Sequence, residues 1–191
     1  MVSLRHRNAA GGLAMSWKST TTRYGGVAVT IHWLTALAVF ALLISGFLAA
    51  NSLDQAQKIN LLRAHAALGS SVLLLTVLRI VWWWLFDRQP ADAPAPAWQQ
   101  RAAKIVHGLL YVVILVVAAS GLAIMALSGA GNILFGATPP PLPDFREFLP
   151  RGPHGLGARL LLLLVAVHIG AALYHQFARR DRLLARMGLG R

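Results

Sequence analysis

Four histidines, His32, His65, His154 and His168, lie within or at the ends of apolar segments too long for an ordinary soluble core. His154 and His168 are fourteen residues apart in one segment. In a helix this spacing keeps them within about 40° of one face and separates them by roughly 21 Å along the axis, against a hydrocarbon layer about 30 Å thick. An ionisable residue inside a membrane is costly, so its default interpretation is functional. Imidazole pairs at two depths suggest two haems stacked across a membrane.

The elements that must position these histidines are four apolar segments. We predict membrane-spanning helices over about 27–50, 59–86, 103–127 and 153–178, each of roughly 24 residues and long enough to cross. The runs are continuous rather than alternating, which argues against a β-barrel. No period of 20 to 50 residues repeats, so we expect no internal duplication. The predicted fold class is all-α, an integral membrane four-helix bundle that holds two b-type haems.

The composition agrees with a membrane protein. Of the 191 residues, 57% are hydrophobic and only 13% are charged, with a mean hydropathy of +0.58. Average soluble domains are about 45–50% apolar and about 25% charged. The chain has no Cys, which excludes disulfides, thiolate ligation and covalent haem attachment. A haem would therefore be held by its axial ligands and by packing.

The net charge of +12 could suggest a nucleic-acid partner, but its distribution argues against one. Twelve basic residues fall in three segments that share one side of a four-span protein: Arg5, Arg7, Lys18, Arg23, Arg88, Arg101, Lys104, Arg179, Arg180, Arg182, Arg186 and Arg191. The other side carries Lys58, Arg63, Arg146, Arg151 and Arg159. This bias places both termini in the cytoplasm. The basic tails would meet anionic lipid headgroups.

These observations divide the chain into three parts. Residues 1–23 form a basic cytoplasmic tail, 24–178 the four-helix domain, and 179–191 a second basic tail. Residues 1–14 could be a start-site artefact, because Met15 is an alternative start.

The topology pairs the histidines by depth. His65 and His154 fall toward the periplasm, and His32 and His168 toward the cytoplasm. Two axial imidazoles saturate a haem iron, which then suits one-electron transfer. The alternative is that each histidine only donates to a backbone carbonyl within the bundle. Metal transport would need ligands at one depth, usually with carboxylate or thiolate partners, and the spans have none.

Two further histidines belong to the cytoplasmic layer. His107 begins the third span, and His175 lies seven residues beyond His168, within about 20° of the same helical face. Both could line a quinone pocket, because imidazoles can supply the protons that quinone reduction needs. Both could equally be interfacial histidines in contact with headgroup water. His107 could also replace His32 or His168 as a ligand.

Arg79 lies fourteen residues after His65 on the same face, and the spans offer it no carboxylate. A haem propionate would be a suitable partner through a charge-assisted bond. Extension of the side chain to the interface is the alternative.

Five sequence segments resemble the bacterial cytochrome b561 family of dihaem membrane proteins. They are RYGGVAVTIHW (23–33), RAHAALGSSVLLLTVLR (63–79), VHGLLYVVI (106–114), FGATPPPLPD (135–144) and HGLGARLLLLLVAVHIGAALYHQF (154–177). The resemblance covers roughly residues 15–185 and extends to the haem subunits of membrane hydrogenases and formate dehydrogenases. It implies that the metal ligands are His32, His65, His154 and His168.

One branch of that family takes electrons from superoxide at the periplasmic face and reduces ubiquinone near the cytoplasmic face. The positions that match its quinone-side histidines are His107 and His175. The resemblance therefore implies two non-covalent haems b, ubiquinone as acceptor or donor, and superoxide:ubiquinone oxidoreductase activity as the preferred hypothesis. The alternative is a non-enzymatic relay or membrane anchor for a separate periplasmic dehydrogenase or soluble cytochrome.

Overall fold

The structure is a computed structural model that describes residues 16–136 and 141–189. Its four long helices are α1 (Gly26–Asn51), α2 (Gln55–Val81), α3 (Ala97–Leu127) and α5 (Arg151–Leu173). The shorter elements are α4 (Ala130–Phe135), π-helical turns at Trp82–Phe86 and Tyr174–Arg179, and 3₁₀ helices at Phe145–Glu147 and Leu183–Met187. Each of the four long helices is long and apolar enough to cross a membrane, which confirms the predicted number of spans. The suggested start-site artefact at 1–14 lies outside the described residues.

The helices extend beyond the predicted apolar segments. α3 begins at Ala97, six residues before the predicted start at 103. Pro96 precedes it, and a proline is well tolerated where a helix begins. The difference arises because hydropathy marks only the part of a helix that meets lipid, whereas backbone hydrogen bonding continues into polar residues. The six-residue α4 is too short to leave a periodic signal in the sequence.

Local signals set the turns between these helices. Asp54 caps α2, and its carboxylate accepts hydrogen bonds from the backbone N–H groups of Ala56 and Gln57. Gly129 adopts a left-handed conformation with φ of 68° between α3 and α4, which a residue without a Cβ does at little cost. Pro153 lies in the first turn of α5, where the missing N–H of a proline costs no intrahelical hydrogen bond.

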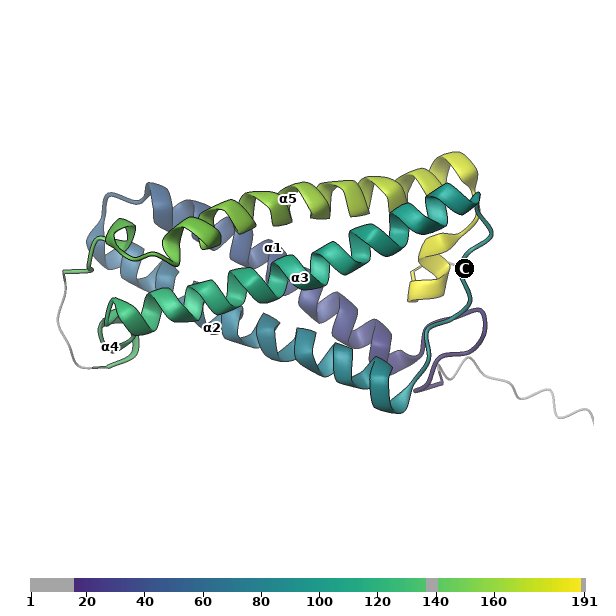
Figure 1. Ribbon diagram of the computed structural model, residues 1–191, viewed down its shortest axis with the longest axis horizontal. Coiled ribbons are helices and arrows are strands. Elements are labelled where there is room, and N and C mark those ends of the chain that lie inside the picture. The colour runs from purple at the N-terminus through teal and green to yellow at the C-terminus, as the bar shows by residue number, and fades with distance from the viewer. Residues whose placement is uncertain (1–15, 137–140, 190–191) are drawn as a thin grey trace, which may run out of the picture.

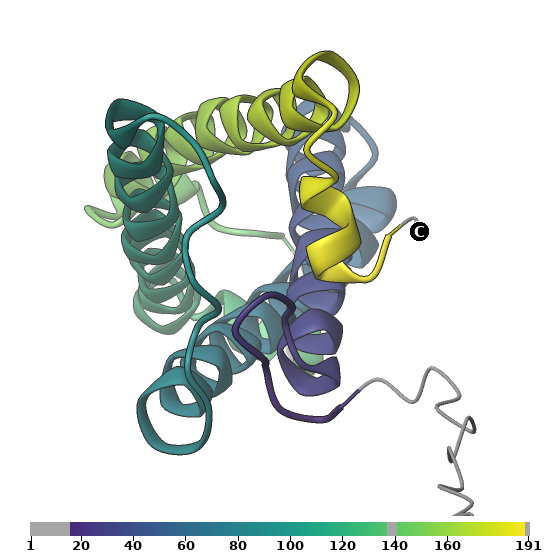
Figure 2. The same ribbon diagram turned by 90° about the vertical axis from the view of Figure 1, so that its right-hand side faces the viewer.

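The long helices form two antiparallel hairpins, α1 with α2 and α3 with α5. The hairpins meet mainly where α2 approaches α3, and Figure 2 shows the four helices arranged around a common axis. Figure 1 shows the C-terminal residues and the linker between α2 and α3 at one end of the bundle, which we call the terminal end. The opposite end, which carries α4, we call the loop end.

The buried core lies midway along the bundle. It is built from Val39, Val72, Val113, Leu161 and Leu164, so that every long helix contributes. Val72 is seven residues from His65, and Leu161 is seven residues from both His154 and His168. At the helical rise of 1.5 Å, seven residues correspond to about 10 Å. An apolar layer therefore separates the histidines of the loop end from those of the terminal end.

Large apolar side chains remain exposed along all four long helices. Examples are Leu37, Phe47, Leu74, Val112 and Leu163. A soluble protein rarely exposes so much contiguous apolar surface, whereas lipid tails are a suitable neighbour for it. The exposed faces therefore agree with a membrane-embedded bundle.

The residues before α1 are fixed to the end of α2 through Asp87. The Asp87 carboxylate accepts hydrogen bonds from the Ser19 N–H at 3.1 and 3.0 Å, the Ser19 hydroxyl at 2.8 Å and the Trp82 indole at 3.2 Å. Partial burial raises the pKa of this carboxyl. The bonds from Ser19, Arg88 and Trp82 outweigh burial and hold its pKa below the usual value.

The C-terminal segment also packs on the terminal end. The Trp33 indole donates to the Met187 carbonyl at 3.1 Å, and Arg186 Nε donates to the Thr22 carbonyl at 3.0 Å. The backbone N–H of Tyr24 returns a bond to the Arg186 carbonyl at 3.2 Å. The sequence predicted a basic tail that meets lipid headgroups. That contact stays a prediction; at Arg186 the structure adds hydrogen bonds to backbone carbonyls of neighbouring loops, those of Thr22 and Ala91.

Candidate functional site

His65 on α2 and His154 on α5 face one another near the loop end. Their ring centroids are 6.1 Å apart, and the ring planes are inclined at 68°. A metal that binds one nitrogen of each of two opposed imidazoles at about 2 Å requires ring centroids roughly 6 Å apart. The spacing of this pair therefore suits an iron between the rings.

A serine hydroxyl on α1 orients the His65 ring. Ser45 Oγ lies 3.1 Å from His65 Nδ1 and 3.2 Å from the Leu42 carbonyl. Because a carbonyl can only accept, the hydroxyl proton is directed to Leu42, and Ser45 accepts from the N–H of His65. This tautomer leaves the lone pair of His65 on Nε2, the nitrogen available to a metal.

The His154 ring has the corresponding partners on α3. Its Nδ1 lies 2.9 Å from the Val117 carbonyl and 3.3 Å from Ser120 Oγ, and the Ser120 hydroxyl donates to the same carbonyl at 2.9 Å. Nδ1 of His154 therefore carries the proton, and Nε2 keeps the lone pair. A histidine that donates its second N–H to a carbonyl is the usual arrangement for a metal ligand.

Two glycines provide the space that these rings occupy. A Cβ added at Gly46 would lie 3.0 Å from Cε1 of His65, and one at Gly121 would lie 3.0 Å from Cε1 of His154. Both distances are shorter than ordinary van der Waals contacts. Any larger residue would push the imidazole out of its present position.

The second pair, His32 on α1 and His168 on α5, lies toward the terminal end. The ring centroids are 6.2 Å apart with the planes at 68°, almost the same geometry as the first pair. His107 on α3 also approaches His168, with a centroid distance of 5.2 Å. That distance is shorter than the roughly 6 Å that an intervening metal requires. The spacing therefore favours His32 over His107 as the partner of His168.

Arg79 distinguishes the second pair from the first. Its Nη1 lies 3.0 Å from Nδ1 of His32, and its Cζ is 5.8 Å from the centre of the Tyr111 ring. A guanidinium can only donate, so Nδ1 of His32 accepts and its proton resides on Nε2. Binding of a metal through Nε2 thus requires Arg79 to release Nδ1. Nε of Arg79 is buried and has no hydrogen-bond partner among the residues that the structure describes.

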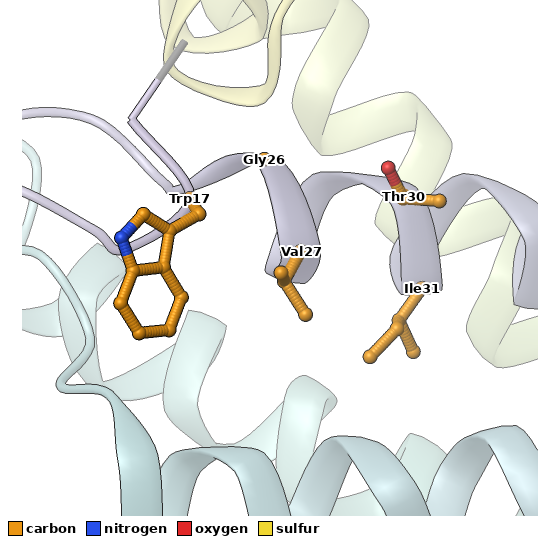
Figure 3. A pocket seen from close by; sticks show the side chains of 5 residues that line it. All are labelled: Trp17, Gly26, Val27, Thr30 and Ile31. Atoms are coloured by element: carbon orange, nitrogen blue, oxygen red, sulfur yellow. The ribbon is translucent and has the colours of Figure 1, made fainter.

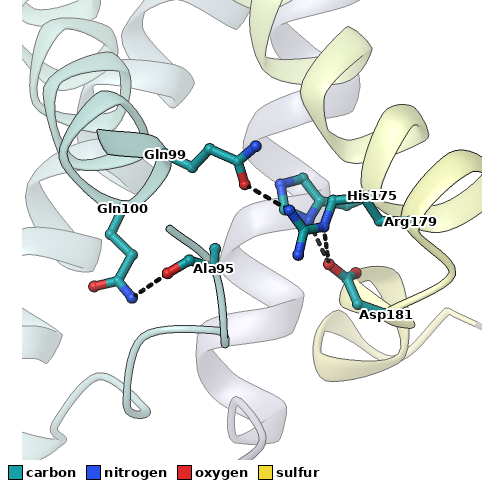
Figure 4. A network of polar contacts seen from close by, with 6 residues as sticks. All are labelled: Ala95, Gln99, Gln100, His175, Arg179 and Asp181. Carbon is teal, nitrogen blue, oxygen red and sulfur yellow. Dashed lines mark hydrogen bonds and ion pairs between the residues drawn. The ribbon is translucent and has the colours of Figure 1, made fainter. Parts of the chain in front are cut away.

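His175 has a different partner. In the π-helical turn after α5, its Nδ1 lies 2.5 Å from a carboxylate oxygen of Asp181, and Nε of Arg179 lies 3.7 Å from the same oxygen. Arg179 also donates to Gln99 on α3 at 3.2 Å, so the network joins two helices at the terminal end (Figure 4). His107 and His175 therefore share the terminal end, but His107 faces His168 and His175 faces Asp181.

A separate pocket of about 430 Å³ opens at the start of α1 (Figure 3). Its lining residues are Trp17, Gly26, Val27, Thr30 and Ile31. They are mostly apolar and include none of the histidines discussed above, so the pocket has no evident part in their chemistry.

Several residues of the site were not found from the sequence. These are Ser45, Ser120 and Asp181. The close approach of Gly46 and Gly121 to the imidazole rings was also not predicted. A Ser-Gly dipeptide begins thirteen residues after both His32 and His107, and this repeated spacing was the available signal.

Comparison with known proteins identifies the family of the chain. Residues 23–190 match the family model described as prokaryotic cytochrome b561. The chain is 31% identical to "Cytochrome b562" of Cereibacter sphaeroides, over 86% of this chain and 94% of that protein. It is 28% identical to "Cytochrome b561 homolog 1" of Escherichia coli K12, over 86% and 96% respectively.

A further relative is "Probable superoxide oxidase CybB" of Yersinia pestis, 25% identical over 86% of this chain and 95% of that protein. These matches support b-type haem binding, transmembrane electron transfer and a place in a bacterial membrane. The chain belongs to the prokaryotic cytochrome b561 family.

Proposed function

We propose that this protein carries electrons across the bacterial inner membrane through two haems b, each held by two histidines. His65 and His154 would hold the haem at the loop end, and His32 and His168 the haem at the terminal end. The observation that carries the proposal is the repeated geometry of the two pairs, 6.1 and 6.2 Å between ring centroids with both plane angles at 68°. Coincidental histidines in a bundle would have no reason to repeat a spacing that suits iron.

The terminal end is assigned to the cytoplasm. Residues 16–25, the linker between α2 and α3 with the first turns of α3, and residues 179–189 lie there and carry most of the basic residues that the structure describes. The loop end then faces the periplasm, and residues 16–25 and 179–189 lie at the cytoplasmic surface.

Haem, when bound, would supply a one-electron iron couple. The protein holds and orients it. Ser45 and the Val117 carbonyl fix the tautomers of the loop-end imidazoles, so that both Nε2 lone pairs are available. The apolar core between the two pairs keeps water out of the middle of the bundle. A buried, dry setting limits the reorganisation that accompanies a change of charge.

Arg79 is the proposed anchor for a haem propionate. Its unpartnered Nε needs an acceptor, and the membrane-spanning segments provide no carboxylate. A propionate would form a charge-assisted hydrogen bond with it. The same contact would draw the guanidinium away from His32.

Ubiquinone is the proposed electron acceptor at the terminal end. Its reduction takes up two protons as well as two electrons, so the pocket needs groups that transfer protons. His107 and His175 are the candidates, and the short contact between His175 and Asp181 links one of them to a carboxylate beside the aqueous surface. The carboxylate could replenish the proton that His175 gives up.

Superoxide is the proposed electron donor at the loop end, in line with the name of the Yersinia relative. Two superoxide anions would each lose one electron and become dioxygen, while one quinone gains two electrons and two protons. A cation near this end of α5 supports the entry of an anion there: the Arg151 guanidinium lies over Gly155, the residue that follows His154.

The second candidate function is a non-enzymatic relay or membrane anchor for a separate periplasmic dehydrogenase or soluble cytochrome. It requires the same two haems but a protein partner at the loop end. The names of the relatives "Cytochrome b562" and "Cytochrome b561 homolog 1" specify no substrate, which leaves room for it.

A pyridine haemochrome assay on the purified protein tests the central proposal, with two haems b per chain as the expected result. His65→Ala or His154→Ala should remove one haem and leave the other. A haem-free protein, or variants that keep both haems, would refute it. Rapid mixing of the oxidised protein with superoxide then separates the two functions. Haem reduction near the diffusion limit supports the oxidase, and reduction no faster than that of free haem supports the relay.

A further inference from the structure

α1 and α3 repeat the same residues at the same spacing. His32, Leu42, Ser45 and Gly46 of α1 correspond to His107, Val117, Ser120 and Gly121 of α3, each 75 residues later. The contacts correspond as well. Ser45 and Ser120 donate to the carbonyls of Leu42 and Val117, at 3.2 and 2.9 Å. The added-Cβ distances to the facing imidazole atoms Cε1 and Nδ1 are 3.0 and 3.3 Å at both Gly46 and Gly121.

α2 and α5 correspond in the same way, with an offset of 89 residues. His65 matches His154, and the core residue Val72 matches the core residue Leu161. Both helices end in a π-helical turn at the terminal end. The bundle thus consists of two hairpins with corresponding residues, related by offsets of 75 and 89 residues rather than by a repeat of 20 to 50 residues. The longer connection between α3 and α5, which contains α4, changes the offset and removes any single period from the sequence.

In this correspondence, Arg79 on α2 matches His168 on α5, which is a proposed haem ligand. Arg79 follows His65 by fourteen residues, as His168 follows His154. At the terminal end the two hairpins therefore present related sets of groups, His32 with Arg79 on one and His107 with His168 on the other. Within each set the two side chains are close: 3.0 Å separates Arg79 Nη1 from His32 Nδ1, and 5.2 Å separates the ring centres of His107 and His168.

Two places between the hairpins are therefore related to each other, and each is flanked by one side chain from either hairpin. One lies between His32 and His168, where both groups are imidazoles. The other lies between His107 and Arg79, where one group is an imidazole and the other a guanidinium. A guanidinium has no lone pair to offer a metal and keeps its charge in proteins. The first position can hold a haem through two ligands, and the second cannot.

We propose that Arg79 is the specificity-determining residue of the terminal end, because it makes only one of two related positions able to bind haem. The inference rests on the proposed ligation of haem by His32 and His168. His107 then lies at the position on α3 that corresponds to His32 on α1, but it binds no haem iron.

The test exchanges the two residues in the full-length protein, as Arg79→His together with His168→Arg. The pyridine haemochrome assay counts haems per chain, and low-temperature electron paramagnetic resonance identifies low-spin ferric haem with two histidine ligands. The control His168→Arg alone should keep only the loop-end haem. The exchanged protein should regain the second haem.

The dependence on other histidines should also be exchanged. Adding His107→Ala to the exchanged protein should remove the second haem, and adding His32→Ala should leave it. In the wild-type background the two alanine variants should behave in the opposite way. A general loss of stability would affect each alanine variant in the same way in both backgrounds. It would therefore not produce this reversal.

A second protein, Arg79→His with His32→Ala, covers the case in which the exchange disturbs folding. It should hold two haems, whereas His32→Ala alone should hold one. The loop-end haem reports that the bundle is folded. Retention of only that haem in both combined proteins, or loss of all haem from both, overturns the proposal. If the wild-type protein itself holds fewer than two haems, it is the proposed function that fails.

Discussion

Nη1 of Arg79 lies 3.0 Å from Nδ1 of His32, so the histidine accepts a hydrogen bond from a cation. At the loop end the relation is reversed, because Nδ1 of His154 donates to the Val117 carbonyl at 2.9 Å. A donated N–H makes an imidazole a stronger electron donor to a metal, and a nearby cation opposes positive charge on it. The two pairs therefore share a spacing but differ in their electrostatic setting.

We expect Arg79→Met to lower the midpoint potential of the terminal-end haem. Loss of the cation stabilises the oxidised, more positive iron, and a fall of roughly 60 mV corresponds to a tenfold change in a one-electron equilibrium. A potentiometric titration followed by optical absorbance measures both haems. Arg79→Lys keeps the charge and should shift the potential less. An unchanged potential, or a shift confined to the loop-end haem, would contradict the assignment.

Gly121→Ala should weaken haem binding at the loop end. The new Cβ would lie 3.0 Å from Cε1 of His154 and displace the ring. Changes next to a metal ligand typically cost roughly 10–100-fold in affinity, and we expect a loss in that range. Titration of haem into the apoprotein measures it.

Gly108→Ala is the matched control on the same helix, because an added Cβ there meets nothing within 4 Å. Alanine is the better helix former by about 1 kcal/mol, so helix propensity alone would favour both variants. Equal haem affinity in the two variants would show that the contact with His154 has no role.

Asp181→Asn should slow quinone reduction and leave the haem content unchanged. The variant keeps the shape of the side chain but removes the carboxylate that lies 2.5 Å from Nδ1 of His175. Loss of a proton-transfer group typically costs about 10²–10⁴-fold, and we expect a loss toward the lower limit because water can substitute in part. Quinol formation under steady-state conditions is the measurement.

Gln100→Ala serves as the control for this variant, because Gln100 bonds the Ala95 carbonyl at the same end of the bundle without touching His175 (Figure 4). A normal rate in Asp181→Asn would exclude the carboxylate from proton delivery.

Attachment of the segment before α1 should depend on pH through Asp87. The folded-state pKa of this carboxyl lies below its unfolded value of about 3.9. Its contribution to stability is therefore fully present above that pH and is lost as the pH falls through the folded-state pKa. Limited proteolysis should cut residues 16–25 faster at pH 3 than at pH 7.

Asp87→Asn should remove most of this pH dependence and speed up the cleavage at pH 7. Asp92→Asn is the control, since Asp92 forms an exposed ion pair with Lys104 at 2.7 Å, and such pairs contribute little. A pH response that persists in Asp87→Asn would assign it to another group.

The sequence by itself determined the number of spans and the histidines that could act. Apolar runs of this length must form helices in lipid, because only a helix satisfies the backbone hydrogen bonds of a single segment. The fourteen-residue interval between His154 and His168 likewise places both on one helical face. Their assignment as haem ligands, and that of His107, His175 and Arg79 to haem or quinone, remain predictions.

Only the tertiary structure decided which groups meet. The distance of 5.2 Å between His107 and His168, against 6.2 Å between His32 and His168, depends on how two hairpins pack. The hydrogen bond between Arg79 and His32 also joins different helices. So do the close approaches of Gly46 and Gly121 to the facing imidazoles. Helical periodicity fixes the face of one helix on which a residue lies. It does not fix the rotation of that helix against its neighbours, which side-chain packing across the bundle determines.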